Sequence, residues 1–140
     1  MNVIFPKDNI MTTKLFNAGQ DWETPIPGFF ILSPLRKGIR SVTDLTEKES
    51  IEFIQLIRRI RKGMREALNI DDVYLFQNED TEHGFHLWMF PRHKWMDKFG
   101  RKIQSVRNIM NYSVENMNND KSIREVKDCV KKMKEYLSKN

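Results

Sequence analysis

The sequence predicts an α+β domain in which a mainly antiparallel sheet packs against one long helix and is followed by a C-terminal helical extension. A chain of 140 residues has room for one hydrophobic core. Short apolar runs bounded by Pro and Gly indicate strands, and apolar residues at three- and four-residue spacing indicate helices. We place the sheet and the long helix in residues 1–96 and the extension of the same domain in residues 97–140.

The composition is that of a soluble globular protein, with 39% hydrophobic and 31% charged residues. No apolar run approaches the roughly 18 residues that a membrane-spanning helix needs. The N-terminal residues lack the basic and apolar regions of a signal peptide. Cys129 is the single cysteine, which excludes an internal disulfide and a cysteine-based zinc site. We therefore expect a cytoplasmic protein without membrane contact.

The net charge of +5 raises the question of nucleic-acid binding. Residues 1–93 carry 12 Lys and Arg against 13 Asp and Glu, whereas residues 94–140 carry 12 against 6. The excess is spread over sequence with a helical pattern, which is typical of solvated helix faces. Nucleic-acid binding remains an alternative that the charge distribution does not favour.

Three apolar segments predict the better-defined strands, at residues 29–32, 73–76 and 85–90, and the first twenty residues predict one or two more. Pro91 closes the segment 85–90, because proline cannot donate to a sheet ladder. Alternation along this segment places two sets of side chains on opposite faces: Phe85, Leu87 and Met89 on one, and His86, Trp88 and Phe90 on the other.

The long helix is predicted to begin after Thr46, which forms a capping box with Glu49. Its apolar stripe is expected to comprise Ile51, Phe53, Ile54, Ile57, Ile60, Met64 and Leu68. Asn69 is expected to end it. Two further helices are predicted over residues 102–117 and 122–137, the second with Val126, Val130, Met133 and Leu137 on one face.

Three motifs resemble the histidine triad (HIT) superfamily: the segments 28–37, 75–78 and 86–92, read in this order around the long helix. Aligning the family's Pro-Arg ending with Pro91 and Arg92 places Gly84, His86 and Trp88 at the three histidine positions. The chain therefore resembles a divergent member in which only the middle histidine is in register. The resemblance covers roughly residues 21–93.

The resemblance implies a covalent nucleotide chemistry centred on His86. In the family the middle histidine attacks the α-phosphorus of a nucleotide and passes the nucleotidyl group to water or another acceptor. Imidazole suits this step, because much of it is unprotonated at neutral pH. We expect a nucleotide hydrolase or nucleotidyl transferase acting on dinucleoside polyphosphates or nucleoside phosphoramidates, a homodimer, and no cofactor or metal. The alternative is a nucleotide-binding module of the same fold with weak or no turnover.

The same resemblance assigns roles to five further residues. Asn78 and Arg92 are expected to contact phosphate, with Trp88 and Gly84 shaping the same phosphate-binding site. Asp21 is expected to bind the ribose hydroxyls. For Asp21 and Asn78, a purely local role in a turn is an equally good interpretation.

The other histidines and tryptophans receive structural interpretations. His83 is out of register and is interpreted as a surface-loop residue unless a bulge at Gly84 turns it inward, and His93 is expected to face solvent. The acidic residues of the segment 79–82 are expected to repel phosphate unless Arg92 or a metal offsets them. A metal site at the histidines is disfavoured, because the spacing of His83 and His86 suits a helix rather than a strand. The tryptophans Trp22, Trp88 and Trp95 are assigned to the core and a dimer surface rather than to base stacking.

Overall fold

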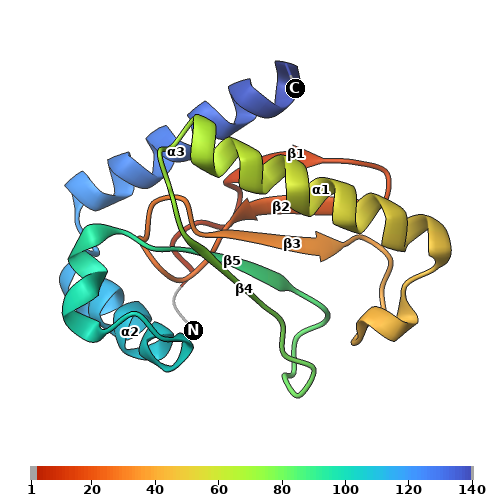
Figure 1. Ribbon diagram of the computed structural model, residues 1–140, viewed down its shortest axis with the longest axis horizontal. Helices are drawn as coiled ribbons and strands as arrows, with labels where there is room; N and C mark the ends of the chain where they lie inside the picture. Colours follow the sequence, from red (N-terminus) through yellow and green to blue (C-terminus); the bar gives the residue numbers. More distant parts are fainter. Residues whose placement is uncertain (1–2, 140) are drawn as a thin grey trace.

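The computed structural model describes residues 3–139. It contains one five-stranded sheet in the order β1-β2-β3-β5-β4, in which every neighbouring pair is antiparallel. The strands are β1 (Asn9–Thr12), β2 (Phe16–Gln20), β3 (Phe30–Pro34), β4 (Val73–Phe76) and β5 (Leu87–Pro91). The helices are α1 (Glu47–Glu66), α2 (Val106–Asn116) and α3 (Asp120–Lys139). The predicted antiparallel α+β fold is therefore confirmed (Figure 1).

Two hydrophobic cores lie on opposite faces of the sheet. On one face, α1 and α3 run together over the strands, and Leu56, Ile60, Val130 and Met133 pack on the strand residues Phe30, Leu32, Leu87 and Met89 (Figure 1). On the other face, α2 and the 3₁₀ helix Lys94–Phe99 bury Phe29, Phe90 and Met96. Residues beyond 96 thus contribute to both cores, and α3 covers the sheet alongside α1.

The start of α1 forms as predicted, but the helix ends at Glu66, shortly before Asn69, and its buried face differs from the prediction. Thr46 and Glu49 form the capping box, and Asn69 adopts the left-handed conformation, with φ of 57°. Ile51 and Ile54 are more than half exposed, whereas Leu56 is buried. Gly63 is also buried, because α3 approaches so closely there that a Cβ would lie 2.9 Å from Met133 and Tyr136. The buried face of α1 therefore includes Leu56 and Gly63, which the apolar spacing did not indicate.

The strand β5 begins two residues later than predicted and includes Pro91. Phe85 donates its amide to the Ile39 carbonyl at 2.9 Å, so that this amide is used by a loop rather than by the sheet. Pro91 pairs with Val73 as the last residue of the strand. The predicted alternation of faces is confirmed, because Leu87 and Met89 lie in one core and Trp88 and Phe90 contact the other.

Within the described residues, no helix combines the length and the apolar character needed to cross a membrane. Among the same residues, no group of three or more His, Cys, Asp or Glu side chains is arranged to hold a metal ion.

Candidate functional site

A cavity of about 250 Å³ lies on the α2 face of the sheet at the start of β5. Four of the residues singled out from the sequence line it: Asp21, Asn78, His86 and Trp88. They come from the end of β2, the end of β4 and the start of β5, which the antiparallel order β3-β5-β4 brings together. Trp88 lies opposite Ile31 on β3, and both form the apolar floor of this cavity.

The ring of His86 is held in one orientation by the backbone. Its Nδ1 lies 2.5 Å from the carbonyl oxygen of Gly84, and since a carbonyl can only accept, Nδ1 carries the proton. In the neutral ring, Nε2 then keeps a free lone pair. The ring edge also packs against Trp22, with centroids 5.5 Å apart.

Burial lowers the pKa of His86 below its usual value of 6.5, and the nearby His83 lowers it further, against the opposing effect of the Gly84 hydrogen bond. A lowered pKa means that the imidazole is neutral at pH 7. His86 therefore combines a half-buried position, a defined tautomer and an unprotonated Nε2, which are the properties of a nitrogen nucleophile.

Asp21 lies in the wall of the same cavity and is only 5% exposed. Its Oδ2 accepts hydrogen bonds from the Thr24 hydroxyl at 2.6 Å and the Thr24 amide at 3.1 Å. Both interpretations from the sequence thus apply to its position: Asp21 organises a turn and also lines the cavity. Burial raises its pKa from 3.8 to about 6, since the hydrogen bonds from Thr24 only partly offset desolvation.

The raised pKa of Asp21 predicts a pH-dependent cost to stability. The folded state binds this proton more tightly than the unfolded state, so the stability that Asp21 contributes is lost as pH rises from about 4 through 6. We expect Asp21→Asn to be more stable than the wild type at pH 7.5 by about 1–3 kcal/mol, with the difference vanishing near pH 4. Urea unfolding at both pH values measures it, with the exposed Asp80→Asn as the control. A difference that does not change with pH would contradict the prediction.

The loop before β5 places its residues differently from what was expected. Of the segment 79–82, Thr81 lines the cavity, while Glu79, Asp80 and Glu82 are exposed and do not line it. Gly84 was expected in the same site as Asn78, but it does not line this cavity; it lines a second cavity, which His86 lines as well.

Of the two other histidines, one lies where it was predicted and one does not. His83 is an exposed residue of the irregular loop before β5, as predicted, and it also lines the first cavity, with its ring 6.2 Å from that of His86. His93 does not face solvent: its Nε2 donates to the Pro27 carbonyl at 2.6 Å, and burial lowers its pKa. Its role is to join two loops away from the first cavity.

Comparison with known proteins identifies the fold. No family model and no curated protein sequence matches this chain significantly. Solved structures do match: a histidine triad protein from Marinobacter aquaeolei has a TM-score of 0.66 at 15% identity, over 92% of this chain and 89% of that one. A HIT-like protein from Bartonella henselae, involved in cell-cycle regulation, has a TM-score of 0.64 at 18% identity, over 94% and 88%. The diadenosine triphosphate hydrolase of Plasmodium falciparum, in complex with cyclomarin A, has a TM-score of 0.64 at 19% identity, over 98% and 80%.

The chain has the histidine triad fold. The matches extend over most of its length, so α2 and α3 are included in much of the superposed region. The sequence resemblance was confined to roughly residues 21–93 because the helices beyond them carry no motif that a single sequence reveals.

Within the histidine triad fold, Arg92 lies far from the cavity, and its predicted contact with phosphate requires correction. Six residues of extended chain separate it from His86, a distance of about 20 Å along the strand. Its guanidinium is 1% exposed and donates to the Gly100 carbonyl at 2.9 Å and to Asp97 at 3.4 Å. Arg92 thus anchors the 3₁₀ helix Lys94–Phe99 to the sheet.

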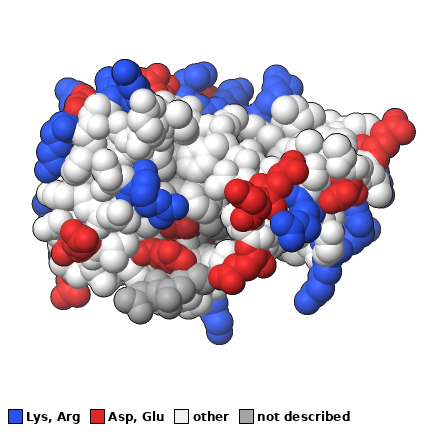
Figure 2. All heavy atoms as spheres, turned by 90° about the horizontal axis from the view of Figure 1, so that it is seen from below, with Lys and Arg blue, Asp and Glu red and all other residues white. Residues whose placement is uncertain are grey.

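A different arginine, Arg107 of α2, reaches the cavity. Arg107 and Met110 lie one helical turn apart and both line it. Among the described residues, Arg107 makes no ion pair. Figure 2 shows this side of the molecule as a largely uncharged hollow with basic and acidic groups at its edges. No signal in the sequence pointed to Arg107, because the packing of α2 on Phe29 and Phe90, which are far away along the chain, decides which face of the helix meets the sheet.

Trp22 is a second residue that the sequence interpretation missed. Trp22 and Trp88 both line the cavity. The assignment to the core holds for Trp88 and Trp95, which pack against the core that contains Phe29 and Phe90, whereas Trp22 is 36% exposed and belongs to neither core. Trp22 follows Asp21 directly, and this adjacency was the available signal. Two indole rings, Ile31 and Met110 make the cavity suited to a flat aromatic group.

Proposed function

We propose that this chain binds a nucleotide in the first cavity and hydrolyses or transfers its nucleotidyl group through a covalent intermediate on His86. The observation that carries the proposal is the hydrogen bond from His86 Nδ1 to Gly84, which leaves Nε2 free in a cavity that also holds Asp21, Asn78 and two tryptophans. The base would stack on the apolar lining, and Asp21 would accept from the ribose hydroxyls. The diadenosine triphosphate hydrolase among the matching structures supports a nucleotide substrate.

The reaction would proceed in two displacements. Nε2 of His86 forms a bond to the α-phosphorus, and the bond from phosphorus to the leaving group breaks with its electron pair. A water oxygen then attacks the same phosphorus and loses a proton to bulk water, the P–N bond breaks, and the electron pair returns to Nε2. Asn78, which lines the cavity, would donate to a phosphoryl oxygen.

The experiment that tests this proposal combines turnover with a trapped intermediate. The full chain is incubated with diadenosine polyphosphates and with adenosine phosphoramidate, and products are separated by chromatography. A sample quenched with denaturant and kept at neutral to alkaline pH, where the P–N bond survives, is digested and examined by mass spectrometry for an adenylyl group on His86. Product together with the adduct supports the proposal; product without the adduct under rapid quench rejects the covalent step.

A nucleotide-binding module without turnover is the second proposal. The observation that favours it is the identity of the two positions flanking His86, where Gly84 and Trp88 provide no imidazole donor. Saturable binding of AMP, detected by quenching of tryptophan fluorescence, with no product after long incubation, would select this alternative.

Arg107 provides a test of nucleotide binding that is independent of the chemistry. We expect Arg107→Ala to weaken AMP binding by about tenfold, since an unpaired guanidinium at the edge of the cavity can pair with a phosphate. The matched control is Arg124→Ala on α3, whose side chain is exposed and does not line the cavity. Isothermal titration calorimetry with AMP measures both, and equal affinities of the two variants would exclude a contact to Arg107.

A homodimer is also proposed. The outer strand β4 pairs only with β5 among the described strands and presents Leu75, which is 49% exposed. An unpaired edge with an apolar side chain is a usual site of association. Light scattering after size-exclusion chromatography determines the oligomeric state, and Leu75→Lys is expected to shift it toward the monomer.

A further inference from the structure

His86 lies between two cavities. The second cavity has a volume of about 380 Å³ and is lined by residues 33–39, at the end of β3 and in the turn after it, together with Gly84, Phe85 and His86. His86 thus lines both the first and the second cavity. A substrate whose phosphorus lies in front of His86 can therefore have its nucleoside in one cavity and its leaving group directed toward the other.

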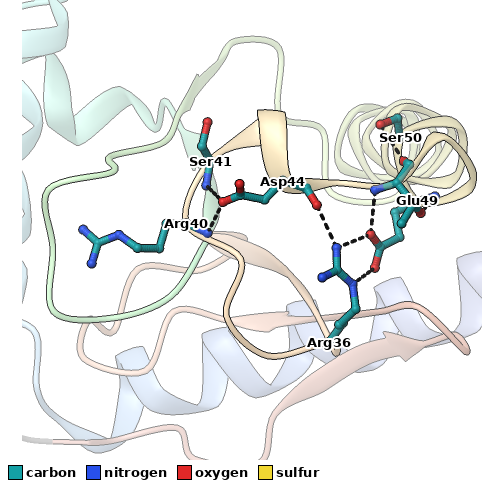
Figure 3. A network of polar contacts seen from close by, with 7 residues as sticks. Arg36, Arg40, Ser41, Asp44, Glu49 and Ser50 are labelled. Carbon is teal, nitrogen blue, oxygen red and sulfur yellow. Dashed lines mark hydrogen bonds and ion pairs between the residues drawn. The ribbon is translucent and has the colours of Figure 1, made fainter.

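The wall of the second cavity is held in place by the start of α1. Arg36 donates to both carboxylate oxygens of Glu49, at 2.8 and 3.0 Å, and to the Asp44 carbonyl at 2.8 Å (Figure 3). Glu49 is 3% exposed, and the hydrogen bond from Arg36 lowers its pKa to about 2, so it is a carboxylate at every pH of interest. The same Glu49 caps α1. The turn after β3 is thus tied to a helix rather than free.

The opposite side of this wall is tied to the segment that joins β4 to β5. The Ile39 carbonyl accepts the Phe85 amide at 2.9 Å, and the Gln77 amide group donates to the Arg40 carbonyl at 3.4 Å. Asp44 in turn accepts the amides of Arg40 and Ser41 at 3.0 and 3.1 Å (Figure 3). The second cavity therefore has defined walls on both sides of His86.

The charge of the second cavity comes from Arg36 and Lys37, and no Asp or Glu lines it. Arg36 is neutralised by Glu49, as described above. Lys37 is exposed and makes no ion pair or hydrogen bond among the described residues, which leaves it available for a ligand. The cavity thus offers an uncompensated cation next to the nucleophile.

Resting on the function proposed above, we propose that the second cavity receives the leaving group and selects phosphate or polyphosphate leaving groups over amines. A departing phosphate takes the electron pair of the broken P–O bond on an oxygen that needs no proton at neutral pH, and Lys37 would pair with its charge. An amine leaving group must take up a proton when the P–N bond breaks, whereas the charged groups that line this cavity, Arg36 and Lys37, are of residue types that are weak acids and suit a departing anion instead. Dinucleoside polyphosphates are therefore favoured over phosphoramidates.

The test compares Lys37→Ala and Lys37→Glu with the wild type on diadenosine tetraphosphate and adenosine phosphoramidate. We expect Lys37→Ala to lower kcat/KM for the tetraphosphate by about three- to tenfold, Lys37→Glu to lower it further, and both to leave the phosphoramidate within twofold. The control is Lys121→Ala, an exposed lysine on α3. Equal losses on the two substrates, no loss on either, or a wild-type preference for the phosphoramidate would overturn the proposal.

Failure of this proposal can be distinguished from failure of the proposed function. An adenylyl group on His86 with unchanged kinetics of the Lys37 variants keeps the covalent function and rejects the leaving-group cavity. If the wild type turns over neither substrate, equilibrium binding decides. Weaker binding of diadenosine tetraphosphate to Lys37→Glu, with unchanged binding of AMP, supports the second cavity, and unchanged binding of both rejects it.

Discussion

Replacing His86 with alanine is expected to reduce nucleotide turnover by at least about a thousandfold, because the variant has no atom that can form the P–N bond. The side chain is half-buried at the edge of two cavities and is not part of either hydrophobic core, so the variant is expected to fold. Initial rates with diadenosine tetraphosphate measure the effect. Retention of the wild-type rate by His86→Ala would show that any hydrolysis proceeds without this nucleophile.

The matched control for this prediction is His93→Gln. His93 is the other buried histidine, and its Nε2 donates to the Pro27 carbonyl, a contact that the amide of glutamine can replace. We expect this variant to keep at least half of the wild-type rate. A complementary variant, His86→Gly, leaves space for free imidazole, and partial recovery of the rate with added imidazole would show that the missing function is nucleophilic rather than structural.

Replacing Met133 with alanine is expected to lower the free energy of unfolding by about 2–5 kcal/mol. Met133 of α3 is fully buried and packs against Gly63 of α1, so truncation leaves a cavity between the two helices and the sheet. Urea unfolding followed by circular dichroism measures the change. The neighbouring Lys134→Ala, whose side chain is exposed, is expected to stay within about 0.5 kcal/mol of the wild type.

The result for Met133 also tests the organisation of the chain. If α3 were an appendage, its loss of packing would leave the rest of the fold intact, and unfolding of Met133→Ala would show two transitions. A single transition at lower urea concentration is expected instead, because α3 shares one core with α1 and the sheet.

Local patterns in the sequence predicted most of the secondary structure. The capping box at Thr46 and Glu49 and the alternation along β5 depend on residues close in sequence, and both are confirmed. The end of α1 was predicted only approximately, since the helix ends at Glu66 and Asn69 lies in the turn that follows. The start of β5 could not be predicted as well from the sequence, because the carbonyl that accepts the Phe85 amide belongs to Ile39, far away along the chain.

Long-range packing determines where several side chains lie that local sequence patterns could not place. The irregular chain before β5 turns His83 into the cavity, and the length of β5 carries Arg92 away from it. Arg107 belongs to a helix whose orientation depends on the core beneath the sheet.

His86 shows both contributions. Its place in a motif, on one face of a short strand, was determined by the sequence, because alternation along a strand is a local property of the backbone. Its free Nε2, its lowered pKa and its position between two cavities were decided by the tertiary structure. The first cavity is closed by α2 and the second is walled by a turn held through Arg36 and Glu49, and these segments meet His86 only when the sheet is assembled.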